Sequence, residues 1–166
     1  MNHNYSIEQN NVILKPLSIN DIQKLRIWRN NPENTKYLRQ IPYITEEMQI
    51  TWFKKYLENN DEYCFAIFSK ELNKVVGSVS LYNFTNNQAE LGKLLIGDHE
   101  AHGKKIGYNA VVAARNLAIN KLHLKKVILH VYKDNKGAFK IYKSAGFKVI
   151  QEKLIENKIE YLMESE

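Results

Sequence analysis

A short strand-like run followed by a glycine-containing turn is the first stretch of the chain whose residue types could do chemistry. Residues 90–96 (Glu-Leu-Gly-Lys-Leu-Leu-Ile) have strand character, and residues 102–107 (His-Gly-Lys-Lys-Ile-Gly) follow at the head of a predicted helix. Such a turn presents free backbone N–H groups at the positive end of the helix dipole, and these groups bind phosphate. Gly103 and Gly107 would let a ligand approach the backbone closely. Two glycines at a helix start are more often an ordinary turn, so the motif alone is a weak signal.

A second segment, residues 135–147 (Asn-Lys-Gly-Ala-Phe-Lys-Ile-Tyr-Lys-Ser-Ala-Gly-Phe), strengthens the first. Asn135 stands at a predicted helix N-terminus, and Tyr142 follows two turns later on the same helix face. Alone, Tyr142 would be read as core packing with its hydroxyl satisfied elsewhere. Because both motifs occur in this order with a strand between them, the pair favours a site that binds an anionic ligand.

The elements that must position these motifs follow from the spacing of apolar residues. Asn30-Asn31-Pro32 ends the first helix, which Ser18 or Asn20 can cap, and Thr45 can cap the second. The predicted strands are 12–17, 63–69, 74–83, 89–96, 126–132, 147–154 and 159–163, and the predicted helices are about 20–30, 45–57, 106–117 and 135–145. This order predicts an α+β domain built on a mixed sheet with helices on its faces. Residues 1–10 are polar and aperiodic, and we expect a loose tail there.

Composition narrows the function classes. The 166 residues suit one domain, 1–166, and the net charge of +6 favours an anionic ligand, either a polyphosphate cofactor or nucleic acid. No stripe of alternating lysines and aromatics is visible, so we expect no nucleic-acid partner. No apolar run is long enough to span a bilayer and the N-terminus lacks a signal-peptide core, so we expect a cytoplasmic protein with no membrane partner.

Cysteine and histidine usage adds two expectations about reactive groups. The single cysteine, Cys64, sits in an apolar run without a neighbouring His, so we interpret it as a core residue rather than a nucleophile. The five histidines lack helical pairing and carboxylates at ligand spacing, so we expect no metal site.

With these motifs in place, the chain resembles the GCN5-related N-acetyltransferases (GNAT) over roughly residues 12–163. In that family an Arg/Gln-x-x-Gly-x-Gly/Ala turn binds the pyrophosphate of acetyl-CoA, and its slots fall here on His102, Lys105 and Gly107. The first two depart from the family pattern. The family's Asn, Ala, Tyr and Gly-Phe positions are all matched, by Asn135, Ala138, Tyr142, Gly146 and Phe147. Trp28-Arg29-Asn30 resembles an element of the RimJ/RimL-like branch and of the branch that acetylates nucleotide-linked 4-amino sugars.

The resemblance implies a mostly antiparallel sheet of about seven strands, with a splay between the fourth and fifth and helices on both faces. It also implies acetyl-CoA as co-substrate, bound by residues near the splay and by the two motifs. The expected contacts are Leu94, Leu95, Ile96, His102, Gly103, Lys104, Lys105, Ile106, Gly107, Asn135, Ala138 and Tyr142. A backbone N–H near Leu95 is the candidate oxyanion donor.

The reaction itself needs a neutral amine and a protonated leaving thiol. Tyr142 is the candidate acid, and Glu90 is the candidate base, with a surface strand carboxylate as an equally weighted interpretation and His130 as a weaker base. The acceptor is expected to meet Trp28, Arg29, Asn30, Tyr37, Arg39 and Glu90.

The acceptor stays open at this level. A nucleotide-linked 4-amino-4,6-dideoxy sugar is slightly favoured, with a ribosomal-protein N-terminus or a polyamine as alternatives. A basic module that binds acyl-CoA or nucleic acid without catalysis is the non-enzymatic alternative, and a homodimer through an exposed C-terminal strand is compatible with the sequence.

Overall fold

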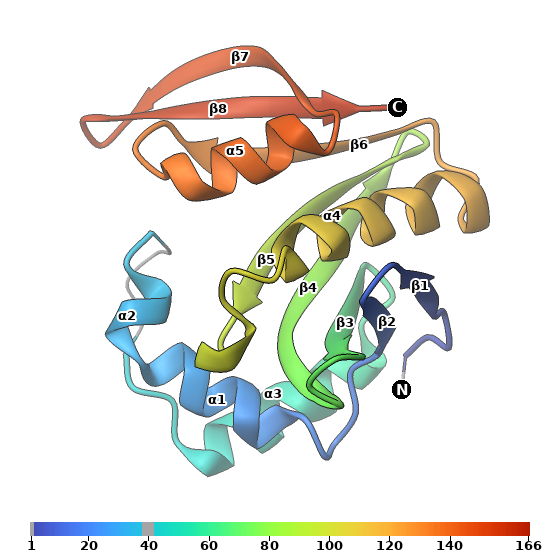
Figure 1. The fold of residues 1–166 in the computed structure, drawn as a ribbon, viewed down its shortest axis with the longest axis vertical. Coiled ribbons are helices and arrows are strands. Elements are labelled where there is room, and N and C mark those ends of the chain that lie inside the picture. Colours follow the sequence, from blue (N-terminus) through green and yellow to red (C-terminus); the bar gives the residue numbers. More distant parts are fainter. Residues whose placement is uncertain (1, 38–41) are drawn as a thin grey trace.

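One eight-stranded sheet organises the chain in a computed structural model that describes residues 2–37 and 42–166 (Figure 1). Its strand order is β1-β2-β3-β4-β5-β6-β8-β7, and every pair is antiparallel except β5 with β6. The strands are β1 (Ile7–Gln9), β2 (Val12–Pro16), β3 (Glu62–Ser69), β4 (Lys74–Thr85), β5 (Gln88–Ile96), β6 (Lys126–Tyr132), β7 (Lys148–Ile155) and β8 (Lys158–Ser165). The predicted mixed, mostly antiparallel α+β fold is confirmed, with one strand more than the expected seven.

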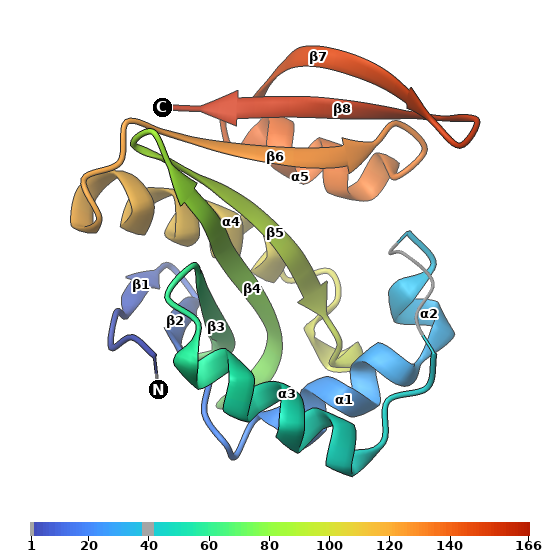
Figure 2. The same cartoon turned by 180° about the vertical axis from the view of Figure 1, so that it is seen from behind.

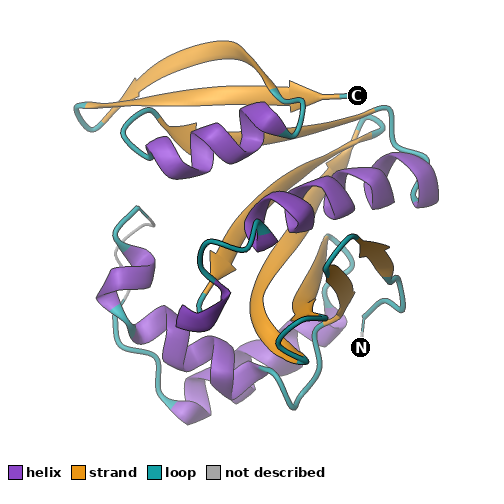
Figure 3. Ribbon diagram, in the orientation of Figure 1, coloured by secondary structure: helices purple, strands orange, loops and turns teal. Residues whose placement is uncertain are grey.

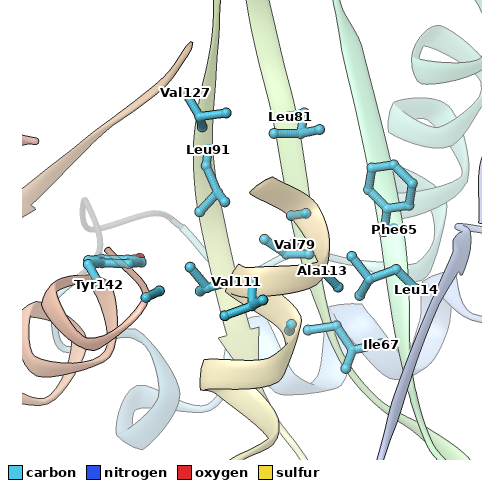
Figure 4. Packing of buried hydrophobic residues seen from close by; sticks show 14 of the residues in the cluster. Leu14, Phe65, Ile67, Val79, Leu81, Leu91, Val111, Ala113, Val127 and Tyr142 are labelled. Atoms are coloured by element: carbon cyan, nitrogen blue, oxygen red, sulfur yellow. The ribbon is translucent and has the colours of Figure 1, made fainter. Parts of the chain in front are cut away.

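Helices cover both faces of the first five strands (Figures 1 and 3). They are α1 (Ile22–Asn30), α2 (Pro32–Thr35), α3 (Glu46–Glu58), α4 (Ile106–Asn116) and α5 (Lys136–Ser144), with a 3₁₀ turn η1 (His99–Ala101) and a π-helical turn η2 (Leu117–Lys121). On one face α4 packs into the larger core, where Phe65, Leu81 and Leu91 are at most 1% exposed (Figure 4). On the other face α1 and α3 enclose a smaller core with Cys64, which is 4% exposed as expected. None of the described helices combines the length and apolarity needed to cross a membrane.

The predicted helix starts are confirmed at two of three places. Thr45 Oγ1 accepts a hydrogen bond from Met48 N at 3.1 Å, and Asn135 Oδ1 accepts one from Ala138 N at 3.3 Å. The expectation that Ser18 or Asn20 caps α1 is wrong, because the N-cap position is Asp21 and its side chain does not cap the helix. Instead the Asp21 carboxylate turns back and accepts bonds from the Ser18 backbone N–H at 2.9 Å and hydroxyl at 3.0 Å.

The N-terminal segment is ordered rather than a loose tail. Residues 7–9 form β1 and pair with Val12–Leu14 of β2. Before it, His3 is 8% exposed and its ring lies 4.6 Å from that of Phe65, while the Asn2 side-chain amide donates to Glu62 O at 2.7 Å. The sequence does not reveal β1 because a three-residue strand is shorter than one full pattern of alternation. Residues 2 and 3 are held by contacts with residues some sixty positions away, which local spacing does not record.

The splay between β5 and β6 is confirmed, and it creates a free backbone edge. The two strands pair only at their starts, where Gln88, Ala89 and Glu90 meet residues 126–128. Beyond Glu90 they diverge (Figure 2). Within the free part, the β4–β5 register shifts and Lys93 adopts φ 55°. An extra residue at this bulge switches faces, so that Leu91 joins the core under α4 whereas Leu95 joins the core under α1 and α3.

Candidate active site

A cavity with a volume of about 680 Å³ lies between α4 and α5, beside the two sequence motifs. We call it the α4–α5 cavity. It is lined by Ile96, Ala101, His102, Gly103, Lys105, Ile106, Gly107, Tyr108, Lys140, Ile141 and Ser144. Its volume falls within the range of cavities that hold cofactors. The turn that the sequence predicts to bind phosphate therefore opens onto a cavity rather than onto the protein's own core.

The backbone at the head of α4 is arranged for anion binding. Within the described chain, the backbone N–H groups of residues 103–108 donate no hydrogen bond to a protein acceptor. Gly103 has φ 78° and a Cβ there would meet nothing within 4 Å. Lys105, which fills the family's glycine slot, keeps the left-handed backbone at φ 59°. The departure from glycine thus leaves the turn intact, and the free amides stand at the positive end of the α4 dipole.

The two adjacent lysines of the turn have different environments. Lys105 lines the cavity, whereas the Lys104 ammonium lies 2.8 Å from the Glu71 carboxylate and does not line it. Gly107 packs closely on α5, because a Cβ there would lie 3.3 Å from Ile141 Cδ1. This glycine therefore serves the α4–α5 contact as well as the turn.

A second cavity, of about 270 Å³, continues from the first along the free edge of β5. We call it the α2–β5 cavity. Its lining brings together Leu94, Leu95, Ile96, His102 and Asn135 with Glu33, Asn34, Lys36 and Tyr37. Ile96 and His102 line both cavities, so the two adjoin. Ala138 lines neither cavity and packs partly buried against the main core.

Tyr142 projects from α5 toward β5, with the hydroxyl end of its ring leading (Figure 4). The residue is 7% exposed, and its hydroxyl makes no hydrogen bond to any described residue. Burial raises the pKa of Tyr142 to about 12. The side chain is therefore protonated at neutral pH and can donate a hydrogen bond to a group that enters the splay.

Glu90 occupies the point where β5 and β6 separate. Its carboxylate accepts hydrogen bonds from Tyr82 Oη at 3.1 Å and Asn83 Nδ2 at 3.1 Å, and it lies 2.9 Å from His130 Nδ1. The bond with His130, opposed by partial burial, lowers the pKa of Glu90 below its usual value. The same bond raises the pKa of His130. The two candidate bases thus form one coupled pair.

A third cavity lies on the other face of the sheet, under α1 and α3, and also has a volume of about 270 Å³. We call it the α1–α3 cavity. It is lined by Leu25, Arg29, Ile44, Met48, Gln49, Trp52, Glu62, Cys64, Ser78, Ser80 and Lys93. Of the residues expected to meet the acceptor, Arg29 alone among the described ones lies here.

The other expected acceptor residues are dispersed. Trp28 packs against the end of β5, so closely on Gly97 that a Cβ there would clash with the indole. Asn30 bridges to the segment before α3, donating to Ile44 O at 2.9 Å and accepting from Ile44 N at 2.8 Å. Tyr37 lines the α2–β5 cavity. Arg39 lies outside the described residues.

Several residues at these cavities were not predicted. Lys140 and Ser144 line the α4–α5 cavity, and their spacing of four on a helix could have placed them together on one face of α5. Glu62, Ser80 and Lys93 line the α1–α3 cavity, but they belong to three different strands, so no spacing along the chain reveals them. Among the described residues, no group of three or more His, Cys, Asp or Glu side chains is placed to hold a metal ion.

Comparison with known proteins agrees with this geometry. A family model described as an acetyltransferase (GNAT) domain matches residues 11–148, and the chain belongs to this family. Acetyltransferase PseH of Campylobacter jejuni is 26% identical over 138 residues, which is 82% of each chain. A protein of Methanocaldococcus jannaschii is 27% identical over 147 residues, and the match spans 85% of this chain but only 29% of that protein. The protein is therefore an N-acetyltransferase by family.

Two solved structures show how widely this fold is used. Spermidine N-acetyltransferase from Vibrio cholerae, in complex with CoA and spermine, has a TM-score of 0.84 at 22% identity and aligns 94% of this chain with 95% of its own. FdhC, a nucleotide-linked sugar GNAT, has a TM-score of 0.79 at 22% identity, covering 96% and 90%. At such identities the likeness establishes the fold, and it leaves the acceptor to be argued from the site.

Proposed function

We propose that this enzyme transfers the acetyl group of acetyl-CoA directly to the primary amine of a nucleotide-linked 4-amino-4,6-dideoxy sugar in a ternary complex. The observation that carries the proposal is the unpaired edge of β5 beyond Glu90. The α4–α5 cavity meets this strand on the face that α4 covers, the α1–α3 cavity meets it on the face that α1 and α3 cover, and the α2–β5 cavity runs along its free edge. A thioester and an amine can therefore approach the same strand from opposite sides without a covalent enzyme intermediate.

The donor half of the proposal rests on the α4 turn and the free strand edge. The unbonded amides of residues 103–108 would hold the diphosphate, and Lys105 and Lys140 would add charge-assisted contacts from the two sides of the cavity. The pantetheine arm, itself an amide chain, would pair with the edge formed by Leu94, Leu95 and Ile96. The Leu95 N–H is the proposed oxyanion donor, placed where negative charge develops on the thioester oxygen.

For the proton taken from the amine, the coupled pair suggests a division of labour. Glu90, with its pKa held below the usual value, is a weak acceptor of a proton from an alkylammonium whose pKa is about 10. His130, with its pKa raised by the carboxylate, is the stronger base of the two. We therefore assign proton acceptance to His130, directly or through water, and treat Glu90 as the residue that orients the imidazole and raises its pKa.

For the leaving group, the pKa of Tyr142 limits what its hydroxyl does. A tyrosine with a pKa of about 12 stands roughly 3.5 units above a thiol of pKa about 8.5, so complete proton transfer to the thiolate would cost about 5 kcal/mol. A hydrogen bond to the sulfur carries no such cost and strengthens as charge develops there. Tyr142 is therefore proposed to stabilise the departing thiolate by hydrogen bonding, with the final proton coming from the His130 imidazolium that has taken it from the amine, or from water.

The preference for a sugar acceptor is supported by the Trp28-Arg29-Asn30 element and by the fold shared with FdhC, a nucleotide-linked sugar GNAT. Polyamines and ribosomal-protein N-termini are the alternative acceptors. The proposal includes a cytoplasmic location and allows a homodimer through β7, the edge strand on which Leu154 is 74% exposed.

The test is a thiol-release assay with acetyl-CoA and three acceptors: a nucleotide-linked 4-amino sugar, spermidine, and a peptide with a free N-terminus. The expected result is a kcat/KM for the amino sugar at least about tenfold above those of the other two. Release no faster than acetyl-CoA hydrolysis with every amine would refute transfer to these classes, and a preference for spermidine would refute the sugar assignment alone.

A further inference from the structure

The α1–α3 cavity has a built polar floor close to the free edge of β5. Ser78 and Ser80 of β4 lie opposite Leu95 and Gly92 of β5 in the strand register. Lys93, the bulge residue between them, also lines the cavity. A group bound there would therefore sit one strand away from the segment proposed to hold the thioester.

The charges that line this cavity sum to one net positive charge. Lys93 Nζ lies 2.8 Å from Glu62 Oε1, and the same ammonium stands 4.9 Å from the centre of the Tyr82 ring. Glu62 is 8% exposed, so this carboxylate is committed to its partner. Arg29 forms no ion pair with any carboxylate in the part of the chain that the structure describes. An uncompensated guanidinium beside a cavity is a site for a carboxylate or phosphate, which it can bind through two parallel hydrogen bonds.

Ser80 supplies an independent indication that a ligand belongs here. It is 1% exposed, and within the described chain its hydroxyl has only the Cys64 thiol opposite it on β3 as a weak partner, with no hydrogen bond of full geometry. A buried hydroxyl so weakly satisfied costs free energy, and a ligand oxygen in the cavity would satisfy it better. Because Ser80 lines the cavity, a rotation about its χ1 would let the hydroxyl bond to a ligand hydroxyl or oxyanion there.

Size and wall chemistry restrict the occupant to a small group. The cavity of about 270 Å³ lies just below the range of about 300–1,000 Å³ typical for whole drug-sized ligands. One wall is apolar, formed by Leu25, Met48 and Trp52, with the Trp52 ring stacked 5.4 Å from that of Tyr56. The cavity therefore suits one ring or short chain with an anionic substituent, and the nucleoside of a nucleotide-linked sugar would lie outside it.

We propose that the α1–α3 cavity is a specificity site that binds an anionic, hydroxyl-bearing group of the acceptor, with Arg29 as the counter-ion and Ser80 as a hydrogen-bonding partner. The Glu62–Lys93 ion pair lines the floor of the cavity. Because Lys93 neutralises the Glu62 carboxylate, that carboxylate does not attract a polycation. The site thus selects amines that carry a phosphate or carboxylate and disfavours polyamines. This inference rests on the proposed acetyl transfer for its purpose, but its binding chemistry can be tested separately.

The first experiment measures binding alone. Protein saturated with CoA, so that the α4–α5 cavity is occupied, is titrated with inorganic phosphate by calorimetry at low ionic strength. Wild-type protein and the charge-matched surface control Lys55→Met should bind phosphate alike, and Arg29→Met should weaken binding by about tenfold or more. Ser80→Ala, which removes one oxygen with little change in shape, should weaken it a few-fold. Equal binding by wild type and Arg29→Met would overturn the proposal even if the enzyme proves to be an acetyltransferase.

The second experiment measures acceptor preference with an amino-sugar phosphate, an amino acid and spermidine. Arg29→Met should raise KM for the two anionic acceptors by about tenfold while leaving KM for acetyl-CoA and for spermidine within about twofold. Lys93→Met, which frees the Glu62 carboxylate, should improve kcat/KM for spermidine and worsen it for the anionic acceptors. The amino-sugar phosphate and the amino acid distinguish phosphate from carboxylate as the bound group. A wild-type preference for spermidine over both would contradict the inference.

Discussion

The two sides of the β5–β6 split differ in how they are supported. The first five strands are covered on one face by α4 and on the other by α1 and α3, and they enclose two cores. The three strands β6, β8 and β7 carry α5 on one face, and Figure 2 shows no helix over the other. On β7, Val149, Ile150 and Leu154 are 41%, 49% and 74% exposed.

This difference matters because the proposed chemistry is divided between the two sides. The well-enclosed side holds the α4 turn, the β5 edge and the α1–α3 cavity, which are the parts proposed to bind and orient both substrates. The thinly covered side carries Tyr142 and His130. It is joined to the rest by buried residues that share the α4 core, by three paired residues of β5 and by Arg115. Its position therefore decides whether the proton-handling groups meet the substrates.

The largest expected effect comes from removing the Tyr142 hydroxyl, which lies on the thinly covered side. Tyr142→Phe should lower kcat by about 100-fold while KM for acetyl-CoA changes less than about twofold, because the hydroxyl acts on charge that appears only as the thioester breaks. Steady-state thiol release measures both constants. Tyr161→Phe, on β8 with its ring 5.3 Å from that of Phe139, is the matched control and should behave as wild type. Unchanged turnover in Tyr142→Phe would remove this residue from the mechanism.

The next largest effect is expected from removing a hydrogen bond that connects the two sides. Arg115 on α4 donates through Nη1 to the carbonyl of Ala145 at the end of α5, at 2.6 Å. Arg115→Met should lower the free energy of unfolding by about 2 kcal/mol, since a charged hydrogen bond is lost and a carbonyl is left without its donor. Hydrogen exchange should quicken in α5 and β7 but not in β3 or β4. The control Lys143→Met removes an exposed charge from α5 and should change neither, and uniform acceleration in all strands would contradict a local joint.

A smaller effect is expected in the pH dependence of stability, through Glu90 and His130. Since the folded pKa of Glu90 is below its ordinary 4.5, its contribution exists above that pH and is lost as the pH falls through the lowered value. Since the folded pKa of His130 is above its ordinary 6.5, its contribution exists below that pH and is lost as the pH rises through the raised value. Glu90→Gln should therefore lower the free energy of unfolding most at pH values between the lowered pKa of Glu90 and the raised pKa of His130.

The loss of unfolding free energy in Glu90→Gln should be at most about 1 kcal/mol, because the His130 side chain is 40% exposed and solvent screens its interaction with Glu90. Urea unfolding of wild type and Glu90→Gln at about pH 5.5 and pH 9 measures the difference. In kinetics, the acidic limb of the kcat/KM profile should move to lower pH in Glu90→Gln, because the imidazole loses the carboxylate that raises its pKa. A limb that stays in place would show that His130 is not the titrating base.

The smallest expected effect lies within the well-enclosed side, at Lys105. Its left-handed φ of 59° costs conformational free energy for a lysine but none for a glycine. Lys105→Gly should leave the free energy of unfolding unchanged or raise it by up to about 1 kcal/mol, while KM for acetyl-CoA rises about threefold through the lost charge. Lys105→Ala keeps the strain and loses the charge, so it should show the same KM without the gain. Equal stability loss in both variants would show that the backbone there is not strained.

Much of this site could be predicted from the sequence, since the part proposed to bind acetyl-CoA is built from contiguous segments. The α4 turn at residues 102–107 and the α5 motif from Asn135 to Tyr142 are local, and a local turn or helix start is specified mainly by neighbouring residues. Lys105 shows the limit of reading by residue type, because a lysine keeps the backbone that a glycine would favour. The acceptor half is different: Glu62, Ser80 and Lys93 converge from three strands, and Asn30 turned out to brace Ile44 at 2.9 Å.

The sequence by itself determined the order and type of the main elements and the two motifs, because periodicity, caps and turn residues act over a few positions, and its resemblance to a known family implied the place of the splay. Tertiary structure alone decided that β1 joins the sheet, that His130 and Glu90 lie 2.9 Å apart, and that Arg29 and Ser80 meet in one cavity. Pairing between distant strands sets those distances, and nothing in local spacing records which residues of neighbouring strands will stand side by side.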